Sequence, residues 1–183
     1  MPLFRAYLAV SADGFIARAD GSVDWLHDYD PVEFGYADFI AGIGSIVMGR
    51  ASYELARSFG PDWAYRDKRC LVVTSRPLDD PPPGVETRTG IPALAAELRA
   101  DAATGDVWLF GGPRLWDGFL AAGALDRFEL YVIPCLLGEG MPLLPPARRD
   151  VALDLVDSRV LGRGVVAQTY AVTARSAGTP PAS

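Results

Sequence analysis

The stretch VWLFGGPRLWDGFLAAGAL (Val107–Leu125) joins an apolar run to a helix-like pattern through two glycines and a proline. The run at 106–110 predicts a buried strand. A helix is predicted over 113–122, with proline at the first position, where its missing N–H costs least. Glycine lets the backbone approach a bound group closely, and a helix N-terminus offers unpaired N–H groups to phosphate. The stretch therefore predicts either a plain strand-to-helix turn or a phosphate-binding turn.

The same alternation of strands and helices recurs along the chain. Strands are predicted around 3–10, 45–49, 69–74, 85–87 and 128–134, and further helices around 32–43, 51–59 and 91–100. Asp30 and Pro31 are expected to open the helix at 32–43, as N-cap and first residue. Late strands at 151–158 and 165–172 are predicted to form a hairpin through the turn at 162–164. This order predicts an α/β fold with a mostly parallel sheet and an antiparallel edge.

Length and composition narrow the class of protein. The 183 residues predict one domain over 1–173 and a disordered tail at 174–183. The net charge of −6 disfavours a nucleic-acid partner. No apolar run approaches the roughly 20 residues that span a bilayer, and the N-terminus lacks a signal-peptide pattern. We therefore expect a cytoplasmic protein with no membrane partner.

Metal and thiol chemistry find little support in the sequence. Cys70 and Cys135 are far apart along the chain, and His27 is the single histidine. A zinc site needs three or four suitable ligands brought together. We therefore expect free, buried thiols, no metal site, and His27 at the surface or at a helix entry.

Groups that can donate hydrogen bonds follow four of the predicted strands. These segments are Ser11–Gly14, Gly49–Ser52, Thr74–Arg76 and Gly111–Arg114. Because the carboxyl ends of parallel strands meet at one edge of a sheet, we expect the four segments along one rim. Hydroxyls, glycine amides and arginines suit a ligand with several phosphates, such as a dinucleotide. The GxGxxG fingerprint and the GxxxxGK[ST] loop are absent, which disfavours a Rossmann dehydrogenase and a P-loop NTPase.

The order of these segments resembles the dihydrofolate reductase-like superfamily. Within it, the sequence is most similar to the family that contains the C-terminal reductase domain of riboflavin biosynthesis proteins. MGRASYE at 48–54 is similar to the family's MGRxTxE, FGGPRLW at 110–116 to its GGxxLW, and LLGEGMPLLP at 136–145 to its PxLLGxG loop. The resemblance covers about residues 3–172. It implies a three-layer α/β/α fold, NADPH as cofactor, and a homodimer that uses the late strands and the LLGEGMPLLP loop.

The resemblance also implies where each part of NADPH would bind. The nicotinamide would border Ala9 and the loop from Asp13 to Ile16, which includes Gly14. The remaining contacts would surround the pyrophosphate and the adenosine, where a basic residue favours the 2′-phosphate of NADP. They are Gly49, Arg50 and Ser52 on one side of the pyrophosphate, Gly111, Gly112, Arg114 and Leu115 on its other side, and Thr74, Ser75 and Arg76 at the adenine ribose.

A carboxylic acid is expected beside the hydride acceptor, where it would orient the acceptor or support its protonation. Counting back from MGR without gaps puts Glu33 at the position of the acid in dihydrofolate reductases. The alternative for Glu33 is a first-turn acid that complements the helix dipole. Asp13 is a second candidate for the catalytic acid, and its alternative is an Asp-Gly turn residue. Ala37 stands where folate reductases usually carry an aromatic residue, which weakens a folate assignment.

The resulting hypothesis is an NADPH-dependent reductase of a small heterocyclic or sugar-imine substrate, riboflavin-type or pteridine-like. Two alternatives stay open. One is a nicotinamide-nucleotide-binding module without turnover, and the other is a true dihydrofolate reductase.

Overall fold

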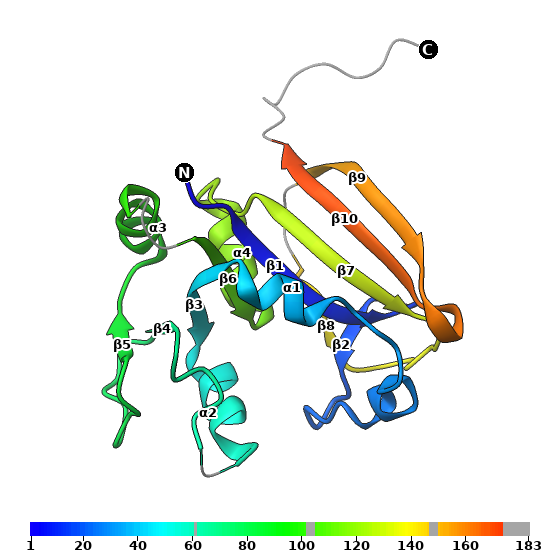
Figure 1. The fold of residues 1–183 in the computed structure, drawn as a ribbon, viewed down its shortest axis with the longest axis horizontal. Coiled ribbons are helices and arrows are strands. Elements are labelled where there is room, and N and C mark those ends of the chain that lie inside the picture. The colour runs from blue at the N-terminus through cyan, green and yellow to red at the C-terminus, as the bar shows by residue number, and fades with distance from the viewer. Residues whose placement is uncertain (61, 102–104, 147–149, 174–183) are drawn as a thin grey trace.

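The chain folds around a β-sheet whose strands are short, apolar and mostly parallel (Figure 1). The computed structural model describes residues 1–60, 62–101, 105–146 and 150–173, so the predicted tail at 174–183 lies outside the described residues. The described residues form an eight-stranded sheet in the order β5-β4-β3-β6-β1-β7-β10-β9. Its strands are β1 (Phe4–Ser11), β3 (Ile43–Gly49), β4 (Arg69–Val73), β5 (Val85–Arg88), β6 (Asp106–Gly111), β7 (Arg127–Ile133), β9 (Ala152–Val160) and β10 (Val166–Thr173).

Strand direction changes once across the sheet. All neighbouring strands from β5 to β7 are parallel, whereas β10 runs antiparallel to both β7 and β9. The connection between β9 and β10 is the short 3-10 helix η2 (Gly162–Gly164). The predicted parallel sheet and its antiparallel edge hairpin are both confirmed.

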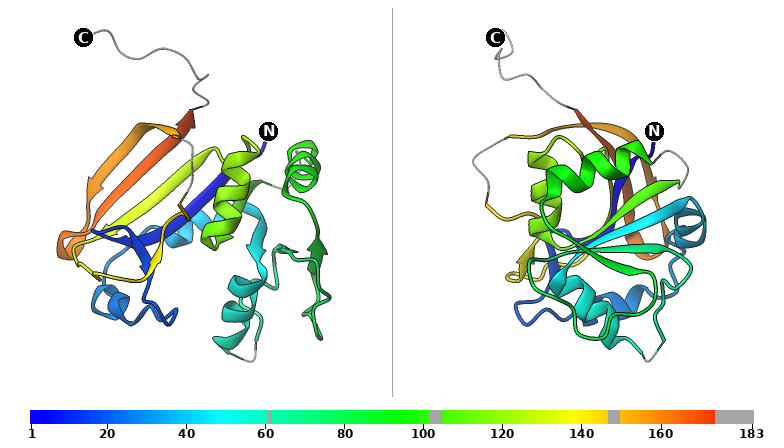
Figure 2. Two further views of the ribbon diagram at one scale, coloured as in Figure 1. Left: turned by 180° about the vertical axis from the view of Figure 1, so that it is seen from behind. Right: turned by 90° about the vertical axis from the view of Figure 1, so that its left-hand side faces the viewer.

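Helices cover both faces of the sheet (Figure 2). On one face α3 (Ile91–Ala100) and α4 (Pro113–Ala121) pack their buried residues against β1, β3 and β6. On the other face α1 (Tyr36–Ala41) and α2 (Arg50–Ser58) pack against β3, β4 and β6. Successive strand residues point to opposite faces, so Val47 belongs to the first cluster and Met48 to the second. The predicted three-layer α/β/α arrangement is confirmed.

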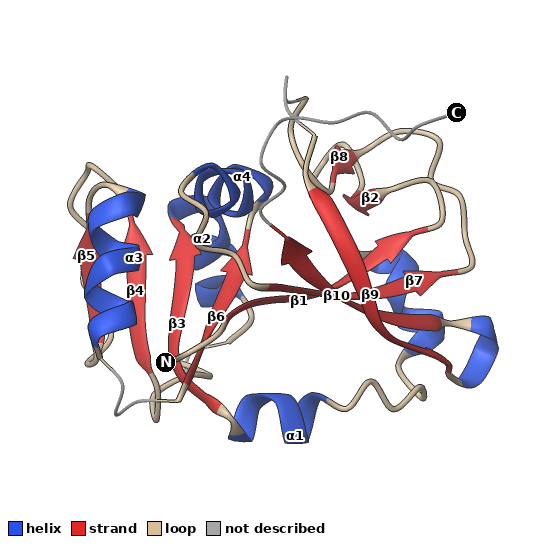
Figure 3. Ribbon diagram, turned by 90° about the horizontal axis from the view of Figure 1, so that it is seen from above, coloured by secondary structure: helices blue, strands red, loops and turns tan. Residues whose placement is uncertain are grey.

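The central strand β1 is paired over different lengths on its two sides. It pairs with β7 from Arg5–Arg127 to Ser11–Ile133. Its described pairs with β6 are Phe4–Val107 and Arg5–Trp108, both near the beginning of the two strands. β1 and β6 therefore part toward their carboxyl ends (Figure 3). In open α/β sheets, ligands bind outside the carboxyl ends of the strands, at such an opening.

The helix predicted over 32–43 is shorter than expected, because α1 spans only Tyr36–Ala41. The 3-10 helix η1 (Asp24–Tyr29) precedes the predicted range, and a loop joins it to α1. The Asp30 amide donates to the His27 carbonyl oxygen, so Asp30 closes η1 and is not an N-cap. Gly35 precedes α1 with a φ of 76°, a left-handed conformation that interrupts a helix and that glycine adopts readily. Burial of Val32 in one cluster with Trp25 holds the intervening loop against the sheet.

Two short strands escaped prediction. β2 (Phe15–Ala17) pairs with β8 (Met141–Pro142) in a separate two-stranded sheet. This pairing joins the loop after β1 to the predicted LLGEGMPLLP loop.

The cysteines and the single histidine largely follow expectation. Cys70 and Cys135 are both free; Cys70 is buried as predicted, but Cys135 is only half-buried because it follows β7 at the sheet edge. His27 lies in η1 and is exposed. In the described part of the chain, every helix is too short or too polar to cross a membrane.

Candidate functional site

The turn after β3 contacts the segment after β4 at the carboxyl edge of the sheet. The Arg50 guanidinium donates hydrogen bonds to the carbonyl oxygens of Arg76, at 3.2 Å, and Pro77, at 2.9 Å. Its Nε also donates to Glu54 one helical turn along α2, at 2.7 Å. The Thr74 hydroxyl accepts a hydrogen bond from the Arg76 amide, which fixes the bend after β4. Two of the predicted segments, Gly49–Ser52 and Thr74–Arg76, therefore lie side by side.

The turn after β6 approaches the turn after β3 from the other side. A Cβ atom added to Gly49 would lie 3.7 Å from the Gly111 carbonyl oxygen, and one added to Gly112 would lie 3.6 Å from the Ser52 hydroxyl. Gly111 has a φ of 137°, and a Cβ there would meet the Trp116 ring at 3.0 Å. The peptide bond between Gly111 and Gly112 is cis. The predicted glycines thus form a close junction of two strand-to-helix turns.

Helices α2 and α4 both begin at this junction with free N-termini. Their N-cap residues are Gly49 and Gly112, so neither helix has a side-chain cap, and neither has an acidic residue in its first turn. Unpaired N–H groups and the positive end of the helix dipole attract anions. The amide of Leu115 donates to the Gly112 carbonyl oxygen and its side chain is buried, so this predicted contact supports the turn from within.

Cationic and hydroxyl side chains surround the junction. Ser75, Arg76 and Arg114 are exposed, and Arg50 and Ser52 are half-buried. Within the described residues, neither Arg76 nor Arg114 forms an ion pair, whereas Arg50 is paired with Glu54. Arg76 and Arg114 therefore offer positive charge at the rim that acidic neighbours do not neutralise.

Asp13 holds the loop after β1. Its carboxylate accepts hydrogen bonds from the Ser11 hydroxyl at 2.6 Å, the Leu137 amide at 3.1 Å and the Gly138 amide at 2.7 Å. These hydrogen bonds, the one from Ser11 first, lower the pKa of Asp13. The Leu143 amide donates to the Gly14 carbonyl oxygen at 3.0 Å and adds a second link between the two loops. The structure gives Asp13 three hydrogen-bond donors within the protein, as a turn residue would have.

Glu33 lies in a different environment. It is exposed in the loop before α1, where its Oε1 accepts a hydrogen bond from the Gly35 amide at 2.8 Å. Because the helix begins later than predicted, Glu33 is not a first-turn residue. The next residue, Phe34, accepts a hydrogen bond from the Tyr7 hydroxyl at 3.0 Å through its carbonyl oxygen, and burial above all raises the pKa of Tyr7. Of the two candidate acids, Glu33 borders the sheet face that α1 covers.

That face carries aromatic side chains, of which the strand residues Tyr7, Trp108 and Phe110 were not predicted as site residues. We name Tyr7, Tyr36, Tyr65, Trp108 and Phe110 the aromatic surface. The Trp108 ring centroid lies 6.5 Å from that of Tyr7, 6.1 Å from Tyr36, 5.7 Å from Tyr65 and 4.9 Å from Phe110. The signal was the alternation within the two strands, since Tyr7 shares a strand face with Ala9, and Trp108 with Phe110.

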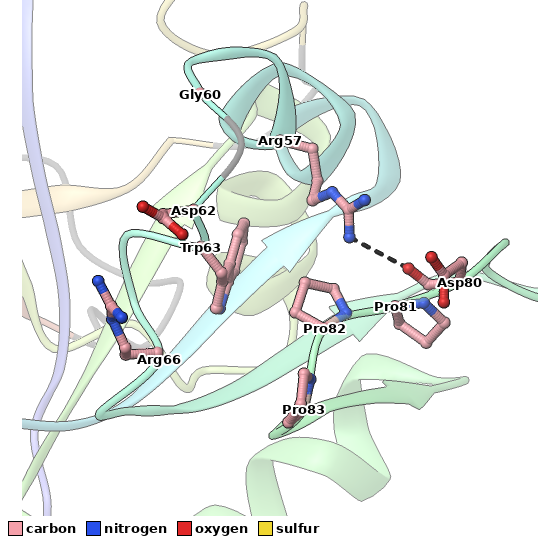
Figure 4. Close-up of a pocket in the computed structure, with 9 residues that line it drawn as sticks. All are labelled: Arg57, Gly60, Asp62, Trp63, Arg66, Asp80, Pro81, Pro82 and Pro83. Carbon is pink, nitrogen blue, oxygen red and sulfur yellow. Dashed lines mark hydrogen bonds between the residues drawn. The ribbon is translucent and has the colours of Figure 1, made fainter.

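A pocket of about 460 Å³ lies outside this arrangement (Figure 4). It is bordered by Arg57 at the end of α2, by Trp63 and Arg66 in the segment that follows, and by the loop at 80–83. Arg57 crosses its mouth to donate to the Asp80 carbonyl oxygen at 3.1 Å. Its lining contains none of the predicted site residues.

The chain is similar to known proteins in both sequence and fold. The family model described as RibD C-terminal domain matches residues 2–167. The uncharacterized protein YwjB from Bacillus subtilis is 34% identical over 161 residues, which cover 87% of this chain and 92% of YwjB. The riboflavin biosynthesis protein RibD from Corynebacterium ammoniagenes is 30% identical over 150 residues, which cover 74% of this chain and 44% of that protein. The chain thus spans less than half of that RibD.

Solved structures extend the comparison to the fold. A putative riboflavin biosynthesis protein from Shewanella sp. PV-4 is 25% identical with a TM-score of 0.83, covering 93% of this chain and 99% of that one. Dihydrofolate reductase from Enterococcus faecalis, solved in complex with NADP(H), is 21% identical with a TM-score of 0.66, covering 93% and 96% of the two chains. The predicted dihydrofolate reductase-like fold is confirmed.

Proposed function

Because the chain belongs to the RibD C-terminal domain family, we propose that it is an NADPH-dependent reductase of a small heterocyclic or sugar-imine acceptor. One observation carries the proposal. The turns after β4, β3 and β6 contact one another at the carboxyl edge, next to the opening between β6 and β1. Two free helix N-termini and several arginines meet there. Such a rim suits an elongated ligand with several phosphates.

The residues present fit the parts of NADPH. In this proposal the pyrophosphate binds at the junction of Gly49 and Gly112, where the absence of side chains leaves room beside the amides. Ser75 and Arg76 bind the 2′-phosphate, which distinguishes NADP from NAD, while Arg50 and Arg114 add positive charge nearby. The nicotinamide lies toward Ala9, Gly14 and Ile16, on the β1 side of the opening; the remaining predicted contacts are Ser52, Thr74, Gly111 and Leu115.

The acceptor then lies beside Ala9, on the face that α1 covers. Bound NADPH would supply a hydride to the acceptor carbon, and the acceptor nitrogen must gain a proton. We assign Glu33 to orient the acceptor and to assist that proton transfer, because its carboxylate borders this face. We assign Asp13 to hold the loop beside the nicotinamide, because three donors already bind its carboxylate.

The test is binding of the cofactor to the purified protein. A ligand that binds the native state alone raises the melting temperature. We expect NADPH to raise it more than NADH does at the same concentration, and we expect Arg76→Ala to remove most of that difference. Arg127→Ala, on β7, is the matched control. Absence of any shift with millimolar NADPH would refute the proposal. Binding of NADPH without its oxidation by any heterocyclic or imine acceptor would instead identify a binding module without turnover.

We also propose that the protein works in the cytoplasm as a homodimer. Exposed apolar side chains on the edge strand β9 support the dimer, among them Leu155, Val156 and Val160. Large exposed apolar patches mark sites of protein association.

A further inference from the structure

The family match does not identify the hydride acceptor, so the side chains around its expected position matter most. Behind the opening, the face under α3 and α4 is filled by packed side chains such as Phe4, Trp116 and Phe119. The opposite face carries the aromatic surface, in which Trp108 is buried and the four rings around it are only partly buried. Tyr36 is 42% exposed, and Tyr7, Tyr65 and Phe110 are half-buried. An acceptor that meets the nicotinamide near Ala9 would therefore contact aromatic rings.

Two tyrosines of the aromatic surface come from different segments of the chain. Tyr36 is the first residue of α1, whereas Tyr65 belongs to the segment between α2 and β4. Both rings meet Trp108 edge-on, with interplanar angles of 66° and 88°. The pair thus connects α1 to the α2–β4 segment across Trp108.

The tyrosine hydroxyls of the aromatic surface are uncharged. Burial raises the pKa of Tyr7, of Tyr36 and of Tyr65, so these hydroxyls stay protonated at neutral pH. Arg5, whose guanidinium stacks on Phe39 near Tyr7, is paired with Glu129 at 2.6 Å and with Asp106 at 3.1 Å. Aromatic rings favour offset or edge contacts with other flat rings. Neutral hydroxyls can hydrogen-bond to the edge of such a ring.

We propose that Tyr36 and Tyr65 set the size limit of the hydride acceptor. The pair admits a flat, neutral heteroaromatic ring to the aromatic surface and excludes a long substituent that would have to pass between α1 and the α2–β4 segment. This inference rests on the proposed function, because it assumes that the nicotinamide binds on the β1 side of the opening.

The experiment compares two ligands with the same ring. 6-Methylpterin carries a small substituent, and folic acid carries the same pterin ring with a long benzoylglutamate tail. Dissociation constants are measured by calorimetry with the protein saturated in NADP⁺. We expect the wild type to bind 6-methylpterin at least tenfold more tightly than folic acid. Tyr36→Ala and Tyr65→Ala should each reduce this ratio at least fivefold, by a gain in folic acid binding.

Three variants serve as controls. Tyr36→Phe and Tyr65→Phe keep the rings and should keep most of the ratio. Phe59→Ala removes an aromatic side chain that is 71% exposed in the same α2–β4 segment, and it should change nothing. Melting temperatures show whether each variant is folded.

The outcomes separate the inference from the function beneath it. A ratio unchanged in folded alanine variants would overturn the role of the pair. Failure of the wild type to bind 6-methylpterin, while NADP⁺ still binds, would overturn the inference alone. Failure of NADP⁺ and NADPH to bind would refute the proposed function, and the inference that rests on it would be refuted as well.

Discussion

At the scale of single residues, the two candidate acids differ in how many hydrogen bonds their carboxylates accept. From the sequence, Glu33 is the first candidate for the catalytic acid and Asp13 the second, and each has a structural alternative. Asp13 accepts three hydrogen bonds from neighbouring loops, and Glu33 accepts one from Gly35. A carboxylate with free lone pairs can bind a substrate or relay a proton. The Ser11 and Gly35 partners are two residues away in the sequence, but the Leu137 and Gly138 amides reach Asp13 only through the tertiary fold, so a local pattern does not predict them.

Glu33→Gln should therefore reduce turnover while preserving the cofactor site. Removal of a group that takes part in proton transfer costs on the order of 10²-fold in kcat. The dissociation constant of NADPH, measured by fluorescence titration, should stay within twofold of the wild-type value. Asp38→Asn, at another exposed carboxylate in the first turn of α1, is the control and should leave kcat unchanged. An equal loss of kcat in both variants would count against a specific role for Glu33.

At the scale of elements, the two glycines in the turn between β6 and α4 have different roles. Gly111 has a φ of 137° and would press a Cβ against the Trp116 ring at 3.0 Å. Gly112 has extended backbone, and its Cβ would make ordinary contact with the Ser52 hydroxyl at 3.6 Å. The first glycine is required by the fold, whereas the second leaves space on the rim.

We expect Gly111→Ala to lower the melting temperature, with a loss of about 1–3 kcal/mol in stability, as for other residues forced into sparsely populated backbone regions. Gly112→Val should stay folded but weaken NADPH binding at least tenfold, because its side chain would occupy the space beside the helix N-terminus. Thermal denaturation and calorimetry on both proteins check the contrast. Normal NADPH binding by Gly112→Val would show that the turn is not a cofactor site.

A network of arginine and glutamate side chains links β4, β5 and α3 on the β5 side of the sheet. Hydrogen bonds from Arg88 and then from Arg69 lower the pKa of Glu97 to about 2. A carboxylate whose pKa is lowered by folding stabilises the native state above its unfolded pKa, and this stabilisation is lost as the pH falls through the folded pKa. For Glu97 the loss falls between about pH 4.5 and 2.

Glu97→Gln should thus be less stable than the wild type near pH 7, by less than about 1 kcal/mol because the pair is partly exposed to solvent. The difference should shrink below pH 4.5 and vanish near pH 2. Urea denaturation over a pH series measures it, and Glu54→Gln, in an exposed pair on α2, should show a smaller dependence on pH. A difference that persisted at pH 2 would contradict the assignment.

The elements that sequence patterns predicted well are those with one dominant local signal. Continuous apolar runs gave β3, β4 and β6, and Pro113 marked the start of α4. The helix predicted over 32–43 begins only at Tyr36, because Gly35 interrupts the helix and Val32 is buried with Trp25 instead. The strands β2 and β8 were missed because two or three residues carry no periodicity, and only their pairing defines them. The aromatic surface needed the pairing of distant strands, which a local pattern does not contain.

At the scale of the whole molecule, strand order puts the proposed cofactor rim and the proposed dimer edge on different strands. The rim lies over β4, β3, β6 and β1, whereas β9 is the last strand at the opposite edge from β5. β9 leaves one side unpaired in the described sheet, and it exposes Leu155 by 57%, Val156 by 54% and Val160 by 78%. Unpaired edge strands associate readily with a second strand unless they are charged, twisted or covered.

A second copy of the chain would cover this edge, and we expect sedimentation at micromolar concentration to give twice the chain mass of 19.6 kDa. Combining Leu155→Lys with Val156→Lys replaces two exposed apolar side chains of β9 by charges and should shift the protein to monomer. NADPH affinity should change less than twofold, because the rim lies on other strands. Leu55→Lys, at an apolar residue that is 45% exposed on α2, should leave the dimer intact. A wild-type monomer at these concentrations would refute the dimer, and a double variant that stayed dimeric would place its interface away from β9.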